Sequence, residues 1–143
     1  MEKKFDIVSP RSLYKDYLLF ANKVIVKRSK IHRWGVFARE EIKKYEIIEE
    51  FPYFFIPSKE IQLSPSCLTY SYDLHGDSII GMGHCGLYNH SFEPNVDYEI
   101  DKVNEVMRHY AIKDILAGEE LTINYGEENA KNFIEQENKI NKE

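Results

Sequence analysis

Short apolar runs separated by glycine, proline and charged turns fill most of the chain. Val24–Val26 and Gly35–Ala38 are typical of strands, and they flank a polar turn at Ser29–Arg33. Glu46–Ile56 is rich in Ile and Phe and ends at Pro57, which predicts a buried strand pair or one long strand. The first half of the chain therefore favours β-structure.

The same pattern continues through the second half. Tyr70–Asp73 and Ser78–Gly81 flank His75-Gly76-Asp77, which is a signal for a β-hairpin. Alternation of apolar and polar positions predicts two further strands, and a turn at Ala117-Gly118 precedes a last short one. These strands are expected over Val96–Ile100, Val106–Ile112 and Leu121–Tyr125.

Helical spacing occurs mainly near the two ends. Arg11–Phe20 spaces its apolar residues like a short amphipathic helix, and Ser64-Pro65 could open one helical turn. Glu127–Lys142 lacks Pro and Gly, which predicts a C-terminal helix whose thin apolar face needs a partner. The pattern predicts a mostly-β protein, with an N-terminal arm and short helix over 1–21, one core domain over 22–126 and a helical tail over 127–143.

Composition narrows the class of protein. A length of 143 residues fits one domain, and 43% hydrophobic with 30% charged residues is ordinary for a soluble globule. The 24 acidic residues outnumber the 19 basic ones, so no direct nucleic-acid binding is expected and a cationic partner suits the chain better. Met1–Ser9 has no signal-peptide pattern, and Phe51–Pro57 is too short to span a membrane. A soluble intracellular protein is therefore expected, in the cytoplasm or the nucleus.

Gly81–Asn95 concentrates polar groups that strands do not usually need. A metal site there would use His84 and His90 with Cys85 or Glu93, but the His-x5-His spacing is not a standard ligand spacing, so no metal is expected. Cys85 could also be a nucleophile, but nothing visibly activates it and a lone cysteine is more often a small core residue. The triplet at 89–91 matches a glycosylation sequon, but glycosylation is not expected because no secretory signal is seen.

Two clusters in order change this interpretation. Asn-His-Ser-x-x-Pro-Asn at 89–95, followed by Gly-Glu-Glu-Leu-Thr-x-x-Tyr-Gly at 118–126, resembles the SET domain of protein-lysine methyltransferases. His32–Ala38 is similar to the family's Gly-x-Gly-hydrophobic-Phe-Ala element, and Asp114–Gly118 to the approach to its final motif. The order and spacing of the three elements agree, and the resemblance covers about 22–126, as in a minimal single-domain SET protein.

The resemblance implies a β-clip-like fold of small curved sheets with a pseudoknot, in which S-adenosylmethionine and the target lysine enter from opposite faces. It implies that backbone groups of Arg33 and Trp34, with the Asn89 side chain, hold the amino-acid end of the cofactor. His90 would offer backbone groups to the adenine, and the Tyr125 hydroxyl would face the transferring methyl group. Phe133 could stack on the adenine, and the expected channel walls are Tyr70, Tyr72, Tyr88, Tyr98 and Ile123.

Three departures from the family pattern carry expectations of their own. Arg33 replaces the first Gly of Gly-x-Gly, and Ile123 replaces a Phe or Tyr. Because Ile123 has no hydroxyl to hold a water beside the lysine nitrogen, di- or trimethylation is expected. No cysteine-rich segment follows the core, so the 127–142 helix or a second copy of the chain in a homodimer would have to close the pocket.

The chemistry fits the residue types. Methyl transfer needs a neutral amine, and a lysine with a pKa of about 10.4 is mostly charged at neutral pH. An apolar channel beside a sulfonium disfavours the ammonium form. The expected function is S-adenosylmethionine-dependent methylation of a lysine in a basic protein or peptide, such as a histone-like tail. The alternatives are a SET-like binding module without catalysis and, more distantly, a β-barrel metal hydrolase that uses the histidines.

Overall fold

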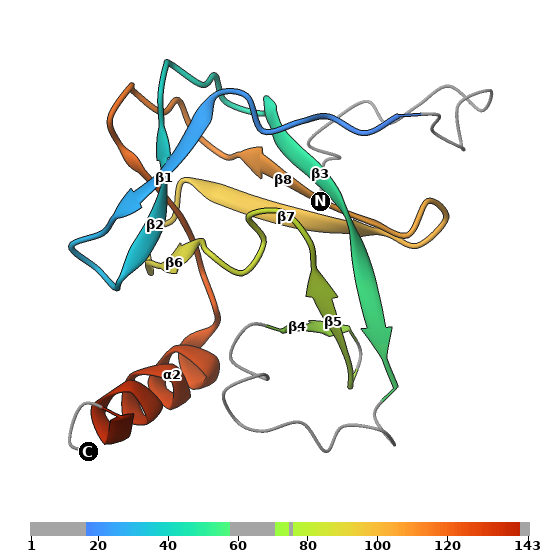
Figure 1. Ribbon diagram of the computed structural model, residues 1–143, viewed down its shortest axis with the longest axis vertical. Helices are drawn as coiled ribbons and strands as arrows, with labels where there is room; N and C mark the ends of the chain where they lie inside the picture. Colours follow the sequence, from blue (N-terminus) through green and yellow to red (C-terminus); the bar gives the residue numbers. More distant parts are fainter. Residues whose placement is uncertain (1–16, 58–70, 75, 141–143) are drawn as a thin grey trace.

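A computed structural model describes residues 17–57, 71–74 and 76–140, and it contains two small sheets and one helix (Figure 1). The first sheet has the order β1-β2-β9-β6, in which β6 and β9 are parallel and the other pairs are antiparallel. Its strands are β1 (Val24–Arg28), β2 (Trp34–Ala38), β9 (Glu120–Ile123) and β6 (Asn89–His90).

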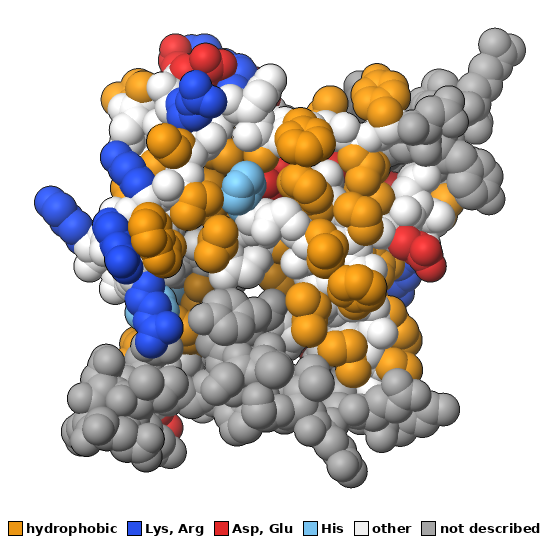
Figure 2. Space-filling view, in the orientation of Figure 1, with side chains coloured by type: hydrophobic (Ala, Val, Ile, Leu, Met, Phe, Trp, Pro, Cys, Tyr) orange, Lys and Arg blue, Asp and Glu red, His pale blue; other side chains and the backbone are white. Residues whose placement is uncertain are grey.

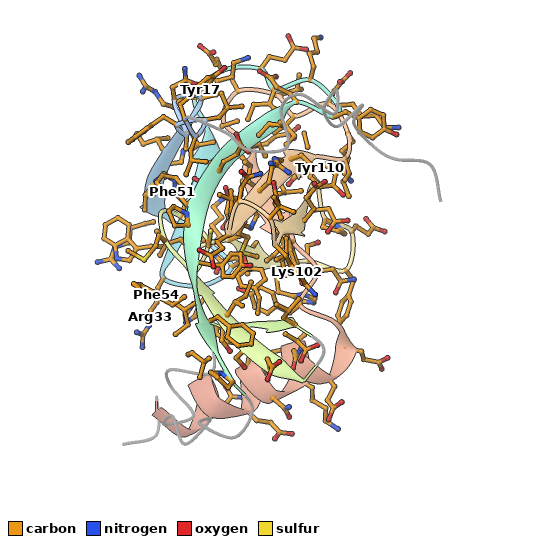
Figure 3. The ribbon with its side chains drawn as sticks, turned by 90° about the vertical axis from the view of Figure 1, so that its right-hand side faces the viewer. Tyr17, Arg33, Phe51, Phe54, Lys102 and Tyr110 are labelled. Atoms are coloured by element: carbon orange, nitrogen blue, oxygen red, sulfur yellow. The ribbon has the colours of Figure 1, made fainter. Side chains whose placement is uncertain are left out.

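The second sheet is antiparallel throughout and has the order β4-β5-β3-β8-β7. Its longest strand, β3, runs nearly the full height of the molecule in Figure 3. The helix, α2, follows strand β9 of the first sheet in the sequence. The elements are β3 (Ile47–Ile56), β4 (Tyr72–Leu74), β5 (Asp77–Gly81), β7 (Val96–Asp101), β8 (Val106–Ala111) and α2 (Glu127–Ile140).

One hydrophobic core cluster joins the two sheets. It contains Val36 and Leu121 from the first sheet and Ile79 and Met107 from the second, all of them fully buried. Apolar side chains also gather on the outside over β3 and β5 (Figure 2). Within the part of the chain that the structure describes, no helix is long and apolar enough to cross a membrane.

Most predicted elements are confirmed. Glu46–Ile56 forms one long strand rather than a strand pair, with a register shift between Ile47 and Glu49. The β4–β5 hairpin pairs Tyr72 with Ile79. The turn at Ala117-Gly118 has Gly118 at φ 92°, a conformation that glycine adopts without steric cost.

Three predictions about elements need correction or lie outside the described residues. Tyr17–Phe20 is not helical, because the Leu19 carbonyl accepts the Glu50 N–H at 3.0 Å, so this segment bonds to β3 instead of to itself. Residues 11–16 and Ser64-Pro65 lie outside the described residues. The last strand ends at Ile123 instead of Tyr125.

Strand β8 is buried at all six positions and does not show the predicted alternation of buried and exposed residues. It is a central strand between β3 and β7, so neither of its edges is open. Met107 and Ala111 on one face belong to the hydrophobic core, and Arg108 on the opposite face pairs with acidic side chains of the two neighbouring strands. Arg108 is buried at 4% exposure because Glu50 and Glu99 each lie 2.7 Å from its guanidinium. A buried cation paired in this way avoids the cost of an isolated charge.

Candidate active site

Side chains of Asn89 and Glu120 connect the turn between β1 and β2 to strands β6 and β9. Asn89 Nδ2 donates to the carbonyl oxygens of His32 and Trp34, at 3.1 and 3.2 Å, and to Glu120 Oε1 at 2.8 Å. Ser29 Oγ donates to both oxygens of Glu120, at 2.8 and 2.9 Å. The side chain of Asn89 is thus used to shape the turn on which Arg33 lies.

Two residues of this turn have unusual requirements. A Cβ atom at Gly35 would overlap the Glu120 carboxylate, so only glycine lets the carboxylate approach the backbone here. Arg33 has a φ of 39°, in the left-handed region that favours glycine. The backbone conformation suited to the family's first glycine is therefore present although the residue is an arginine.

Tyr125 lies at the centre of the second group of candidates. Its hydroxyl donates to the Tyr88 carbonyl at 2.6 Å, and its backbone N–H donates to His90 Nδ1 at 3.0 Å. The His90 ring centroid lies 5.1 Å from that of Tyr125, and the Phe133 ring of α2 packs edge-on against both Tyr125 and His32. Helix α2 therefore contacts, through Phe133, both the β1–β2 turn and Tyr125, which follows β9.

The protonation of His90 follows from its contact with Tyr125. Because Nδ1 accepts an N–H, the neutral ring carries its proton on Nε2. Burial lowers the pKa of His90, which favours this neutral form. Nε2 is buried and has no hydrogen-bond partner among the described residues. It can donate to an acceptor that binds from outside the chain.

The expected channel walls form a separate cluster around His109. Tyr88 stacks on the His109 ring with centroids 4.4 Å apart, and Tyr72 packs edge-on against Tyr98 with centroids 4.7 Å apart. Burial raises the pKa values of Tyr72, Tyr88 and Tyr98, so all three hydroxyls are neutral. The Tyr88 carbonyl, which accepts the Tyr125 hydroxyl, connects this cluster to the turn region.

The remaining residues expected in the site do not all contribute their side chains to these two groups. The Trp34 ring is half exposed and lies under the Arg28 guanidinium, 4.1 Å from it, so only its backbone carbonyl faces Asn89. Ile123 is 3% exposed and belongs to the hydrophobic core cluster. Tyr70 lies outside the described residues. Burial raises the pKa of Cys85 to about 12, so its thiol is not a nucleophile at neutral pH.

Two buried polar residues near this cluster were not predicted from the sequence. Glu49 is 0% exposed and forms an ion pair with His84, whose Nδ1 lies 2.6 Å from Glu49 Oε2. His109 is also 0% exposed. A glutamate within the apolar run of β3 and a histidine at the centre of β8 are the sequence signals that could have identified them.

The arrangement provides the parts that a group transfer requires. Tyr125 packs against His90 and Phe133, and Phe133 also contacts His32 of the turn. The Tyr125 hydroxyl bonds to the carbonyl of Tyr88, whose ring belongs to the cluster of neutral tyrosines around His109. Since the Tyr125 hydroxyl proton is used in its bond to that carbonyl, the hydroxyl oxygen faces any other group as an acceptor.

Comparison with known proteins gives one consistent family. The sequence profile of the SET domain matches residues 33–126. The chain is 30% identical over 98 residues to a Schizosaccharomyces pombe protein named histone-lysine N-methyltransferase, H3 lysine-37 specific, covering 65% of this chain and 66% of that protein. It is also 30% identical over 126 residues to the Saccharomyces cerevisiae histone-lysine N-methyltransferase named H3 lysine-4 specific, covering 79% of this chain but only 12% of the yeast protein.

Solved structures agree with the sequence comparison. A crystal structure of a Plasmodium falciparum protein, described as a candidate histone methyltransferase, has a TM-score of 0.62 and 34% identity, covering 73% of this chain and 94% of that one. A Polycomb Repressive Complex 2 structure from Chaetomium thermophilum has a TM-score of 0.60 and 27% identity, covering 75% of this chain and 15% of that one. The profile match covers well over half of the sequence, so the chain belongs to the SET-domain family.

Proposed function

We propose that this protein transfers a methyl group from S-adenosylmethionine to a lysine side chain of a basic protein or peptide. The observation that carries the proposal is the position of Tyr125. Its hydroxyl is oriented by the Tyr88 carbonyl at 2.6 Å, between the turn held by Asn89 and the tyrosines around His109. A hydroxyl oxygen fixed in this way suits a reacting centre that carries positive charge.

The residues around the turn fit the proposed cofactor. The backbone of Arg33 and Trp34, shaped by Asn89, would hold the amino-acid end, and the unpartnered Nε2–H of His90 would donate to a ring or carboxylate acceptor. Phe133 adds an aromatic ring that packs against His32 of the turn and against Tyr125. When bound, S-adenosylmethionine supplies an electrophilic methyl group.

The tyrosine cluster would prepare the lysine. Neutral, largely buried side chains at Tyr72, Tyr88 and Tyr98 disfavour a charged ammonium by desolvation, which lowers the pKa of a lysine placed among them. Tyr125 would then orient the amine and the methyl group for in-line transfer. Ile123 and Tyr70 are proposed to complete the channel wall.

The substrate proposal follows from charge and from the relatives. The chain carries a formal net charge of −5, which favours encounter with a cationic segment. The curated relatives are named for methylating histone H3. A histone-like basic tail is therefore the proposed substrate class, encountered inside the cell. Helix α2 is proposed to close the cofactor side through Phe133, and a homodimer is the alternative way to close it.

Transfer of a radiolabelled methyl group to a histone H3 tail peptide tests the proposal. Tyr125→Phe should reduce transfer by at least about 100-fold while cofactor binding, measured by calorimetry, changes little. Tyr17→Phe removes a hydroxyl from an exposed tyrosine and serves as the matched control, with unchanged transfer. Near-normal transfer by Tyr125→Phe would remove Tyr125 from this role.

A non-catalytic SET-like binding module predicts a different outcome. In that case the wild-type protein binds the peptide but transfers no label to any lysine, in the H3 peptide or in a cell lysate. Binding without transfer, in protein whose cofactor affinity is confirmed by calorimetry, would replace the proposed activity with a binding role.

A further inference from the structure

Three buried side chains from separate segments of the chain lie close together in the core. Glu49 comes from β3, Cys85 from the loop before β6, and His109 from β8. One potential ligand atom of each lies within 4.8 Å of the other two. Their exposures are 0%, 2% and 0%, so the cluster is closed to bulk solvent.

Hydrogen bonding decides which ring nitrogen of His109 carries the proton. The Tyr72 hydroxyl donates its only proton to the Cys85 carbonyl at 2.6 Å. At 3.2 Å from His109 Nε2 it can therefore only accept, so Nε2 carries the ring proton and Nδ1 has a bare lone pair. Nδ1 lies 3.9 Å from Cys85 Sγ, on the side where the cluster lies.

One oxygen of the Glu49 carboxylate is also fixed by a hydrogen bond. His84 Nδ1 lies 2.6 Å from Oε2, while Oε1 is buried and makes no hydrogen bond of standard geometry among the described residues; the Tyr88 hydroxyl is the polar group that interacts with this carboxylate. The carboxylate, the imidazole Nδ1 and the sulfur all present lone pairs, and the thiol offers one weak donor among them. Such a set of buried lone pairs facing one another is stabilised by a cation or a water that lies between the three.

We propose that Glu49, Cys85 and His109 bind a zinc ion. Carboxylate, thiolate and imidazole are ligands that zinc accepts together. The Sγ to Nδ1 distance of 3.9 Å compares with about 3.5 Å for two such ligands on one tetrahedral zinc. Zinc ligands in proteins are usually oriented by further hydrogen bonds. Here His109 Nε2 donates to the Tyr72 hydroxyl oxygen, and Glu49 Oε2 is bonded to His84 Nδ1.

The charges balance when the ion binds. The Cys85 S–H bond breaks, the proton leaves to solvent, and the sulfur electron pair forms the bond to zinc. The fourth position is open to a water, and the buried Tyr88 hydroxyl, which interacts with the Glu49 carboxylate, is the nearby polar group that such a water could contact. The expectation of no metal rested on the spacing of His84 and His90, neither of which is a ligand here.

The proposed zinc ion would cross-link three segments of the chain. It would connect β3 and β8 of the second sheet to the segment that leads into Asn89 and His90. Its function is therefore structural, and it does not depend on the proposed methyl transfer.

Metal binding by the full chain tests the proposal directly. Protein stripped with a chelator should take up one equivalent of zinc and, with cobalt as the probe, show a sulfur-to-cobalt charge-transfer band. Cys85→Ser should abolish the band and weaken zinc binding by more than the ~10–100-fold that loss of a supporting contact costs. Cys67→Ser, which changes the only other cysteine of the chain, is the matched control and should keep the band.

Glu49→Gln keeps the shape of the side chain, so it tests the loss of the carboxylate in a variant that should still fold. It should weaken zinc binding in protein whose circular dichroism is native, and zinc should raise the unfolding temperature of the wild type but not of this variant. The proposal is overturned if the stripped wild type takes up no zinc and shows no charge-transfer band. It is equally overturned if Cys67→Ser loses the band while Cys85→Ser keeps it.

Discussion

Arg33 adopts a backbone conformation that suits glycine better. With φ at 39°, its Cβ is close to its own carbonyl, at a cost of about 1–2 kcal/mol for an L-residue. The conformation persists because Asn89 holds the carbonyl oxygens of the residues on either side of it, His32 and Trp34. This strain lies within the proposed cofactor site, where fixing the turn before ligand binding reduces the ordering needed on binding.

Replacement of Arg33 separates the backbone effect from the side-chain effect. Arg33→Gly should be more stable than Arg33→Ala by about 1 kcal/mol, because both variants lose the guanidinium and only alanine keeps the steric cost. Urea unfolding of the two variants measures this difference directly. Equal stabilities would mean that the turn relaxes away from the left-handed region in the variants.

Ile123 is the residue expected to set how many methyl groups are added. The wild type should produce di- or trimethyl-lysine, because isoleucine has no hydroxyl to hold a water beside the amine. Ile123→Tyr should shift products toward monomethyl-lysine, as seen by mass spectrometry at long reaction times. Ile123→Phe adds a ring without the hydroxyl and should keep the multiple methylation.

The burial of Ile123 makes a stability control necessary. At 3% exposure a larger side chain overpacks the core, at a cost of about 1–3 kcal/mol, so both variants need matched unfolding temperatures. A wild type that stops at one methyl group would contradict this role, as would an active Ile123→Tyr variant with an unchanged product distribution.

At the scale of elements, the β1–β2 turn, β6 and β9 depend on one another. Asn89 and Glu120 lie on neighbouring strands, and Gly35 leaves the space that brings their side chains against the turn. Asn95 adds a second bridge, with its Nδ2 donating to the Glu120 carbonyl and its Oδ1 accepting the Thr122 N–H, both at 2.8 Å. The two motif clusters of the sequence therefore form one hydrogen-bonded unit.

Asn89→Ala should destabilise this unit. It leaves the His32 and Trp34 carbonyls and the Glu120 carboxylate without their shared donor, which should lower the free energy of unfolding by about 1–3 kcal/mol. Calorimetry should also show weaker cofactor binding. Asn22→Ala changes an exposed asparagine and is the control, with a change below about 0.5 kcal/mol. Unchanged stability and affinity in Asn89→Ala would contradict both roles.

At the scale of the whole molecule, charge is unevenly distributed. The chain is acidic overall, yet Lys27, Arg28, Lys30 and Arg33 are exposed on or beside the β1–β2 hairpin. Figure 2 shows Lys and Arg side chains gathered along this edge of the molecule. No such basic stripe stands out from the composition alone. A basic substrate should therefore approach a part of the surface other than this hairpin.

The pH dependence of the rate also belongs to this scale. Burial lowers the pKa of His90 and raises those of Tyr72, Tyr88 and Tyr98, so these four groups do not change charge between about pH 7 and pH 9. Titration of the substrate amine should then raise the single-turnover rate by up to about tenfold per pH unit. Cofactor affinity measured over the same range is the control. A bell-shaped profile with constant affinity would show that a group of the enzyme titrates instead.

Much of the fold could be predicted from the sequence because its signals are local. The long strand at 47–56, the β4–β5 hairpin and helix α2 follow from apolar period, turn residues and the lack of Pro and Gly. The ordered motifs around Asn89 and Tyr125 also indicated that these residues belong to one site.

Long-range contacts decided the rest. Tyr17–Phe20 has helical spacing but bonds to β3, and β8 alternates in sequence yet is buried at all six positions. Glu49 and His109 have no sequence pattern in common, and they meet only because β3 and β8 pair as neighbours in one sheet. The sequence determined the strands and the motif residues through local physical preferences. Only the tertiary structure decided which polar groups are buried together, because burial and pairing depend on segments far apart in the chain.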